Sequence, residues 1–276
     1  MTVAQIDLPA QTGLRSRFEE DGYVVINSDG FRISTRALSA QLADFIRGCN
    51  FGCLASGFDR RDLEQRYLGD LISAIARREE NNAVTSRLYQ LLPTIPAVYA
   101  FAAQDDLLRS LAEIGLGQPT LGTAPLIRID RPGEKKYQTP WHQDIWYSFA
   151  SDASVVVWMP LGEIAAAQGH LVIMPGSHKN GTLPFRVYEE GHEPFTPCQA
   201  PDESRQQTVP VRFGDILIFK QTLLHKSGTN LSDRCRVSMQ LRFNEMKDQA
   251  QPFATFVPKY SDHVLQQQKK YLASND

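Results

Sequence analysis

The stretch Arg234-Cys-Arg-Val-Ser-Met-Gln-Leu-Arg-Phe-Asn244 is the most informative part of the sequence for the fold. Its residues alternate, because every second residue from Cys235 to Phe243 is apolar and those between are polar or cationic. Side chains of a β-strand point alternately to its two faces. The stretch therefore predicts a strand with one face in a core, packed on helices from earlier in the chain, and the other face lining a polar cleft.

More short runs of strand-forming residues precede this one and are separated by Gly and Pro. They lie at residues 126–130, 154–161, 171–174, 208–213 and 215–219. No helix of crossover length is expected between them, which argues against a parallel sheet. We therefore predict a mainly β core over residues 122–276, of the double-stranded β-helix (jelly-roll, cupin-like) type.

The first half of the chain predicts helices instead. We expect Ser34 or Thr35 to cap a helix with one buried face. That face comprises Leu38, Leu42, Phe45 and Ile46. Further helices are predicted from the apolar period between Leu63 and Ile75, at residues 84–92 and at residues 105–114, with Pro93 and Pro96 breaking the chain between the last two.

A short strand is expected at residues 23–26, before these helices. We expect residues 1–121 to form a mainly helical support layer on the β core. The change of character near Gly122 then separates two layers of one fold, so residues 1–276 are expected to form a single domain.

Composition narrows the classes of partner. The net charge of -2 gives no overall attraction to nucleic acid or to anionic lipid, and no apolar stretch is long enough to span a membrane. Four cysteines are too few for a disulfide framework in a chain of 276 residues. Since the N-terminal residues lack the pattern of a signal peptide, we expect a cytoplasmic protein. With nucleic acid and membranes disfavoured as partners, we expect it to act on a small molecule.

A metal site is indicated by one local motif. Of the six histidines, only His142 has a carboxylate two residues later, at Asp144. Two histidines and one carboxylate on one face of an octahedron form the ligand set of non-haem Fe(II) oxygenases, because they leave three positions open. The second histidine should come from a later strand, and His225 follows the run at residues 215–219.

Beyond these single residues, several blocks occur in the order found in one known family. They are Phe18 to Ile26, Trp141-His-Gln-Asp144, Gly169-His-Leu-Val-Ile-Met-Pro-Gly-Ser-His178, Gly214 to Phe219, His225-Lys-Ser-Gly-Thr-Asn230 and Arg236-Val-Ser238. In these blocks the sequence resembles the phytanoyl-CoA dioxygenase family of Fe(II)- and 2-oxoglutarate-dependent oxygenases. The resemblance covers the C-terminal half and the expected opening strand.

The resemblance implies that His142, Asp144 and His225 bind Fe(II). It also implies that Arg236 and Ser238 hold 2-oxoglutarate, and that the enzyme uses dioxygen to hydroxylate a small metabolite with release of succinate and CO2. Members of this family place the binding arginine eleven residues after the distal histidine, and only His225 among the later histidines has an arginine there. Related halogenases replace the carboxylate with a small residue, so Asp144 argues against halogenation.

Several residues leave alternatives open. Arg128 could reach the near carboxylate of 2-oxoglutarate or an anionic substrate, or could form a structural ion pair with Asp130. Arg234 and Arg242 share the polar face with Arg236, and we expect one to be solvated and the other to form a salt bridge. The aromatic residues Trp146, Tyr147 and Phe149 could line the substrate pocket or pack in the core, and Lys135 and Lys136 are either solvated or close to an anionic group.

A different function class is also compatible with a cupin-like barrel. Such a protein would be a metal-dependent isomerase or a small-molecule-binding protein without oxygenase activity. The combination of Arg236 and Ser238 argues against this alternative. No motif selects a substrate or an oligomeric state.

Overall fold

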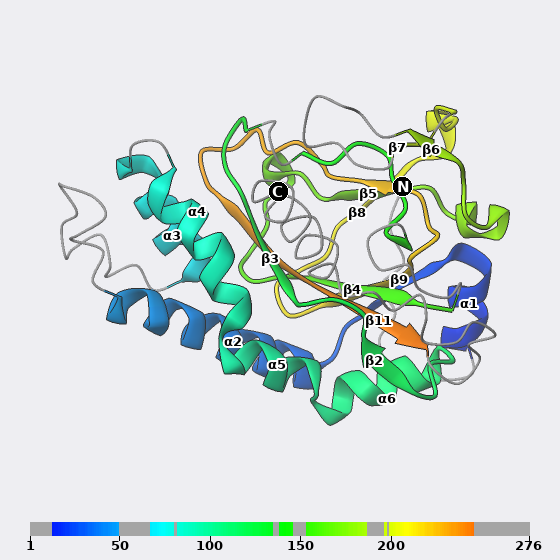
Figure 1. The fold of residues 1–276 in the computed structure, drawn as a ribbon, viewed down its shortest axis with the longest axis horizontal. Helices are drawn as coiled ribbons and strands as arrows, with labels where there is room; N and C mark the ends of the chain where they lie inside the picture. The colour runs from blue at the N-terminus through cyan, green and yellow to red at the C-terminus, as the bar shows by residue number, and fades with distance from the viewer. Residues whose placement is uncertain are drawn as a thin grey trace, which may run out of the picture.

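Two facing β-sheets and a layer of helices make up the fold (Figure 1). The computed structural model describes residues 13–49, 67–79, 82–134, 138–145, 153–186, 196–197 and 199–245. Its α-helices are α1 (Leu14–Asp21), α2 (Asp29–Gly48), α3 (Leu68–Arg78), α4 (Ala83–Leu91), α5 (Pro96–Ala102) and α6 (Asp105–Glu113). Short 3-10 helices are η4 (Leu92–Thr94), η5 (Ala166–Gln168), η6 (Ser177–Asn180) and η7 (Glu203–Arg205).

The larger sheet has six strands in the order β1-β9-β4-β11-β2, with β3 also paired to β11. They are β1 (Tyr23–Ile26), β2 (Pro119–Leu121), β3 (Leu126–Asp130), β4 (Val155–Pro160), β9 (Ile216–Lys220) and β11 (Arg236–Glu245). The smaller sheet has the order β10-β5-β8 and consists of β5 (Leu171–Ile173), β8 (Gln207–Val209) and β10 (His225–Lys226). A two-stranded pair joins β6 (Phe185–Arg186) to β7 (Thr196–Pro197). All pairings are antiparallel, as the absence of crossover helices predicts.

Two cores lie on opposite faces of the larger sheet. Strand β4 is buried on both faces and shows how they divide: Val157 belongs to the core shared with the helices, whereas Trp158 belongs to the core between the sheets. The inter-sheet core also contains Ile173 and Val209 from the smaller sheet. Burial on both faces explains why this strand reads as a continuous apolar run rather than an alternating one. The jelly-roll prediction is confirmed.

Strand β11 has one apolar and one polar face, as the sequence predicts, and all of its residues are buried. Its apolar side chains, from Val237 to Phe243, lie in the core shared with the helices. Figure 1 shows α2, α5 and α6 along that side of the larger sheet, with β5 and β8 on the other side. The polar residues Arg236, Ser238 and Arg242 are buried on the opposite face, and these side chains belong to the site described below.

Helix α2 begins earlier than predicted. Ser28 is its N-cap and accepts a hydrogen bond from the Phe31 main-chain N–H, so the prediction of a cap at Ser34 or Thr35 is wrong. Both residues lie inside the helix. The earlier start has a physical reason, because Ser28 is followed by an acidic residue in the first turn, which the helix dipole favours. Phe45, predicted to be buried, is 37% exposed.

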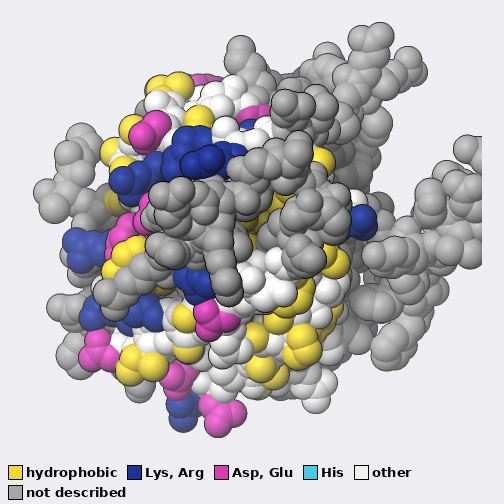
Figure 2. Space-filling view, turned by 90° about the vertical axis from the view of Figure 1, so that its left-hand side faces the viewer, with side chains coloured by type: hydrophobic (Ala, Val, Ile, Leu, Met, Phe, Trp, Pro, Cys, Tyr) yellow, Lys and Arg dark blue, Asp and Glu magenta, His cyan; other side chains and the backbone are white. Residues whose placement is uncertain are grey.

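Helices α4 and α6 agree with the prediction within one residue at each end. Helix α3 begins at Leu68, within the predicted period, whereas Leu63 lies outside the described residues. Helices α1 and α5 were not predicted. Pro96, read as a break, occupies the first turn of α5, where its missing N–H costs no helical hydrogen bond. None of the helices in the described ranges is both long and apolar enough to cross a membrane. On the face turned toward the viewer in Figure 2, basic side chains lie beside acidic and apolar ones.

Candidate metal centre

The two histidines predicted as metal ligands are held together by their main chains. The N–H of His142 donates to the carbonyl of His225 at 3.0 Å, and the N–H of His225 donates to the carbonyl of His142 at 3.1 Å. His142 lies in the connection between β3 and β4, whereas His225 begins β10. This isolated antiparallel bridge places both side chains on the same side, with ring centroids 4.1 Å apart.

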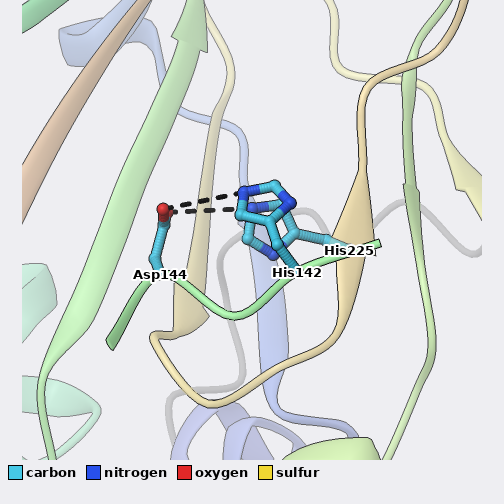
Figure 3. A group of neighbouring side chains, drawn as sticks. All are labelled: His142, Asp144 and His225. Atoms are coloured by element: carbon cyan, nitrogen blue, oxygen red, sulfur yellow. Dashed lines mark ion pairs between the residues drawn. The ribbon is translucent and has the colours of Figure 1, made fainter. Parts of the chain in front are cut away.

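Asp144 completes a compact, buried cluster (Figure 3). Its Oδ1 lies 3.8 Å from Nε2 of His142, and its Oδ2 lies 3.7 Å from Nε2 of His225. One ligand atom from each residue can be chosen so that all three lie within 4.8 Å of one another. Figure 3 shows both imidazole rings facing the carboxylate. The structure thus brings together the three residues that the sequence selects.

Hydrogen bonds orient both imidazoles toward the cluster. Nδ1 of His142 lies 2.8 Å from the carbonyl of Pro140, and Nδ1 of His225 lies 3.0 Å from the carbonyl of Leu223. A carbonyl only accepts, so each Nδ1 carries the proton and each Nε2 offers a lone pair. Burial, assisted by the neighbouring His225, lowers the pKa of His142 to about 3, and burial also lowers the pKa of His225. Both rings are therefore neutral, as metal ligation requires.

The Asp144 carboxylate is held ionised. Burial alone would raise its pKa, but the Arg242 guanidinium and the two imidazoles outweigh burial and lower the pKa to about 2. Nη2 of Arg242 donates to Oδ1 of Asp144 at 2.9 Å. Oδ2 is buried and has no hydrogen-bond partner among the described residues. A buried carboxylate oxygen without a donor is costly unless a cation binds it, so the site fits a divalent metal ion with two nitrogen ligands and one oxygen ligand.

Gln143, between the two ligands, has a role that sequence reasoning missed. Its Nε2 donates to the carbonyls of Gly181 and Thr222, at 2.8 and 2.6 Å, and its Oε1 accepts from the N–H of Leu183 at 2.8 Å. The side chain thus ties the ligand segment to two other loops. Only its position inside the His-x-Asp unit could have drawn attention to it, because a glutamine is usually solvent-exposed.

A second buried polar group surrounds Arg236. Its Nε and Nη2 donate to Oδ2 of Asp130, at 3.1 and 2.9 Å, and its Nη1 donates to the carbonyls of Gly169 and Gly228. Ser238 follows on the same face of β11, and its buried hydroxyl has no hydrogen-bond partner among the described residues. An unsatisfied buried hydroxyl near a buried guanidinium is the arrangement expected of an anion site.

The three other arginines considered for the site, Arg128, Arg234 and Arg242, each lie beside a carboxylate. Arg128 forms the ion pair considered for it, with Nη2 donating to Oδ1 of Asp130 at 2.7 Å. The prediction that one of Arg234 and Arg242 is solvated and the other forms a salt bridge holds for their exposure, but Arg234 also forms an ion pair. Arg234 is exposed and lies 3.3 Å from Asp70, whereas Arg242 is buried against the metal carboxylate.

Two other histidines are placed outside the metal cluster. Nε2 of His178 lies 3.0 Å from the carbonyl of Glu19, so this histidine is bonded to the backbone. His170 is half-buried. Burial lowers its pKa, and the positive charge of Arg236 lowers it further. The pocket candidates Trp146, Tyr147 and Phe149, with Lys135 and Lys136, lie outside the described residues.

Known proteins resemble this chain in sequence and in fold. The profile described as phytanoyl-CoA dioxygenase (PhyH) matches residues 18–238. Phytanoyl-CoA dioxygenase 1 of Oryza sativa subsp. japonica is 25% identical over 245 residues, covering 81% of this chain and 85% of the rice protein. The peroxisomal phytanoyl-CoA dioxygenase of Homo sapiens is 28% identical over 134 residues, covering 45% of this chain and 40% of the human protein. The second match thus spans less than half of the human protein.

A solved structure shares the fold. The structure of EctD from S. alaskensis, with 2-oxoglutarate and 5-hydroxyectoine, matches with a TM-score of 0.54 at 16% identity, covering 93% of this chain and 84% of EctD. The family profile covers the metal ligands, Arg236 and Ser238, and the fold and the buried triad agree with it. This chain belongs to the phytanoyl-CoA dioxygenase (PhyH) family of non-haem Fe(II)- and 2-oxoglutarate-dependent oxygenases.

Proposed function

We propose that this protein hydroxylates a small-molecule metabolite, with 2-oxoglutarate and dioxygen as cosubstrates and with succinate and CO2 as coproducts. The observation that carries the proposal is the buried triad of His142, Asp144 and His225, in which the Nε2 atoms of both histidines and the Oδ2 atom of Asp144 lie close together. Iron bound there, together with 2-oxoglutarate, supplies the oxidising chemistry, which the cofactor performs rather than the protein. The protein holds the ligands, orients the cosubstrate and keeps water from the reacting atoms.

Arg236 and Ser238 are proposed to hold the far carboxylate of 2-oxoglutarate. Arg236 is buried, and Asp130 occupies its Nε and one Nη2 donor. Nη1 already donates to two main-chain carbonyls, so the carboxylate would meet the second hydrogen of Nη2. The Ser238 hydroxyl, buried without a partner among the described residues, is available as a second donor.

Arg128 is proposed to act near the same cosubstrate through its charge. It lies directly opposite Ser238 in the β3–β11 pairing, and its charge contributes to lowering the pKa of His142. Its hydrogen bonds to Asp130 and to Oγ1 of Thr139, at 2.7 and 3.1 Å, fix it at this position. A cation there favours an anionic cosubstrate beside the metal.

The alternative is a cupin-type isomerase or binding protein that uses the metal without 2-oxoglutarate. Such a protein has no need for a buried arginine with an unsatisfied hydroxyl beside it, and the pair Arg236 and Ser238 disfavours it. The two functions differ in one measurable property, which is whether 2-oxoglutarate binds to the metal-loaded protein.

The experiment is anaerobic addition of Fe(II) and 2-oxoglutarate to the purified protein, followed by visible absorption. We expect a charge-transfer band that requires both additions. Arg236→Gln should weaken the band at a given concentration of 2-oxoglutarate. Arg234 is exposed and lies just before the same strand, so Arg234→Gln should leave the band intact. Absence of the band from the wild-type protein would eliminate the oxygenase proposal. Candidate substrates can then be screened by succinate release above the uncoupled background.

We also propose that residues 1–276 form one domain in the cytoplasm. Helices α2 to α6 share a single core with strands β3, β4 and β11, which supports one cooperative unit. The described cysteines, Cys49 and Cys235, are free thiols, as in a reducing compartment. Limited proteolysis tests the first point, because a single domain should give no stable half-length fragment.

A further inference from the structure

Arg242 lies on the polar face of β11, close to the metal cluster. It is buried, with 9% of its surface exposed, and its main chain is paired with Val156 of β4. Its Nη2 donates to Oδ1 of Asp144 at 2.9 Å and to Oε1 of Gln240 at 3.3 Å. The contact with Asp144 joins the last strand of the described chain to the ligand segment between β3 and β4.

This contact makes the two oxygens of the Asp144 carboxylate unequal. Oδ1 accepts a charge-assisted hydrogen bond from Arg242, whereas Oδ2 has no hydrogen-bond partner among the described residues. Both oxygens lie at similar distances from the histidines, 3.8 Å from Oδ1 to His142 Nε2 and 3.7 Å from Oδ2 to His225 Nε2. The position of the carboxylate relative to the histidines therefore does not decide which oxygen binds a metal, and the arginine supplies the difference.

The difference matters because of the number of coordination positions. Two histidines and one carboxylate oxygen leave three positions of an octahedron free, enough for a chelating 2-oxo acid and for dioxygen. A carboxylate that binds through both oxygens leaves only two. A donor fixed on one oxygen opposes the two-oxygen mode, because the metal would have to compete with a charge-assisted hydrogen bond in a buried site.

We propose that Arg242 is a positioning residue that restricts Asp144 to binding the metal through one oxygen, and so keeps the position that 2-oxoglutarate needs. This inference rests on the proposed function, since it concerns the metal at the same triad. It assigns Arg242 a task different from that of Arg236, the arginine proposed to bind the cosubstrate itself.

The test compares Arg242→Gln and Arg242→Met with the wild type and with Arg234→Gln. Each protein is loaded with Co(II) in the absence of 2-oxoglutarate, and its visible absorption reports the coordination of the metal. Both Arg242 variants should change the spectrum, whereas Arg234→Gln should not. Arg242→Met has a similar length without a donor, so it maintains the test if the glutamine variant folds poorly. Arg242→Lys, which keeps a charge and a donor, should restore part of the wild-type spectrum.

Binding measurements supply the second readout. In the Arg242→Gln and Arg242→Met variants we expect affinity for 2-oxoglutarate to fall at least about 10-fold, the lower end of the loss of activity that follows removal of a partner of a metal ligand. Affinity for the metal alone should not fall, because the carboxylate gains a second metal contact and a nearby positive charge is gone. A loss of 2-oxoglutarate affinity without a loss of metal affinity distinguishes a positioning role from a general loss of structure.

Three results would decide against us in different ways. If the wild type shows no band with Fe(II) and 2-oxoglutarate, the proposed function itself fails. If it does, but the Arg242 variants keep the wild-type Co(II) spectrum, Arg242 does not set the coordination of the metal. If metal affinity, 2-oxoglutarate affinity and thermal stability fall together, Arg242 is merely structural.

Discussion

The main chains of His142 and His225 hydrogen-bond to each other in both directions, at 3.0 and 3.1 Å. Two metal ligands from distant parts of the chain are thus brought together by backbone pairing, and the metal is not needed to join them. Their Nδ1 atoms are also bonded to backbone carbonyls. Hydrogen bonds to the main chain thus align both imidazoles.

From this pairing we predict that the metal-free protein stays folded and that a metal adds stability by binding. At a free metal concentration of 100 times Kd the gain should be about 2.7 kcal/mol. His225→Ala should fold but lose this gain. His178→Ala should keep it, because His178 is bonded to backbone outside the cluster. Thermal melts with and without Co(II) measure the gain. The prediction would be contradicted if the protein lost its helical circular dichroism after a chelator had removed the metal.

Asp130 is predicted to be a stabilising residue because it lies between two buried arginines. Its Oδ1 accepts from Arg128 and its Oδ2 accepts from Arg236, and although burial raises its pKa, these arginines outweigh burial and lower it. Asp130→Asn leaves both guanidinium groups without their counter-charge and should cost about 3–5 kcal/mol. Asp44→Asn, which removes an exposed pair with Arg47, should cost at most about 1 kcal/mol. Urea unfolding compares them, and equal costs would show that the buried pairs contribute little.

Gly228 is predicted to tolerate no side chain. A Cβ there would lie 2.1 Å from the carbonyl oxygen of His170, and a Cβ at Gly169 would lie 2.4 Å from that of Thr229. Since the carbonyls of both glycines accept from Arg236, Gly228→Ala should force apart the backbone around the guanidinium. We expect a loss of about 1–3 kcal/mol together with weaker 2-oxoglutarate binding.

The matched control is Gly69→Ala in helix α3, where a Cβ would meet nothing within 4 Å. This substitution should be neutral or should stabilise by up to about 1 kcal/mol. Urea unfolding and the Fe(II)–2-oxoglutarate band are measured on both variants. An unchanged band and an unchanged midpoint in Gly228→Ala would refute the close approach of the two turns.

Cys235 is predicted to limit stability at high pH. Burial raises the pKa of its thiol to about 11, from an ordinary value of 9.0. Because the folded state disfavours the thiolate, the stability linked to this group is fully present below the ordinary pKa and is lost as pH rises through about 11. Cys235→Ala should therefore flatten the decline of the urea midpoint between pH 9 and about 11. Parallel profiles for the two proteins would exclude the thiol as the cause.

The sequence predicts what depends on local pattern. The bounds of β3 agree with the expected run, and β11 differs only at its ends, because strand alternation and apolar runs are local properties. His142 and Asp144 form a unit two residues apart, and His225 and Arg236 are linked by a family spacing. Roles for Arg236, Ser238 and Arg128 in binding 2-oxoglutarate stay predictions.

The remaining features depend on how distant segments meet. The two-residue strands β6, β7 and β10 exist only through pairing, and so carry no period of their own. The bond from Arg242 to Asp144 requires β11 to run beside β4 in one register, which the sequence does not state. The three hydrogen bonds of Gln143 involve two loops whose positions follow from the whole barrel.

Strand β11 forms a wall of the helix-side core with one face and carries Arg236, Ser238 and Arg242 on the other. Inserting or deleting a single residue within it would exchange the two faces, sending guanidinium groups among the helices and methyl groups toward the metal. The same alternation of side chains along β11 thus places both the core residues and the residues of the site. For directed evolution, the strand is a place for point exchanges alone, and libraries that vary chain length belong in segments that leave its pairing with β3 and β4 intact.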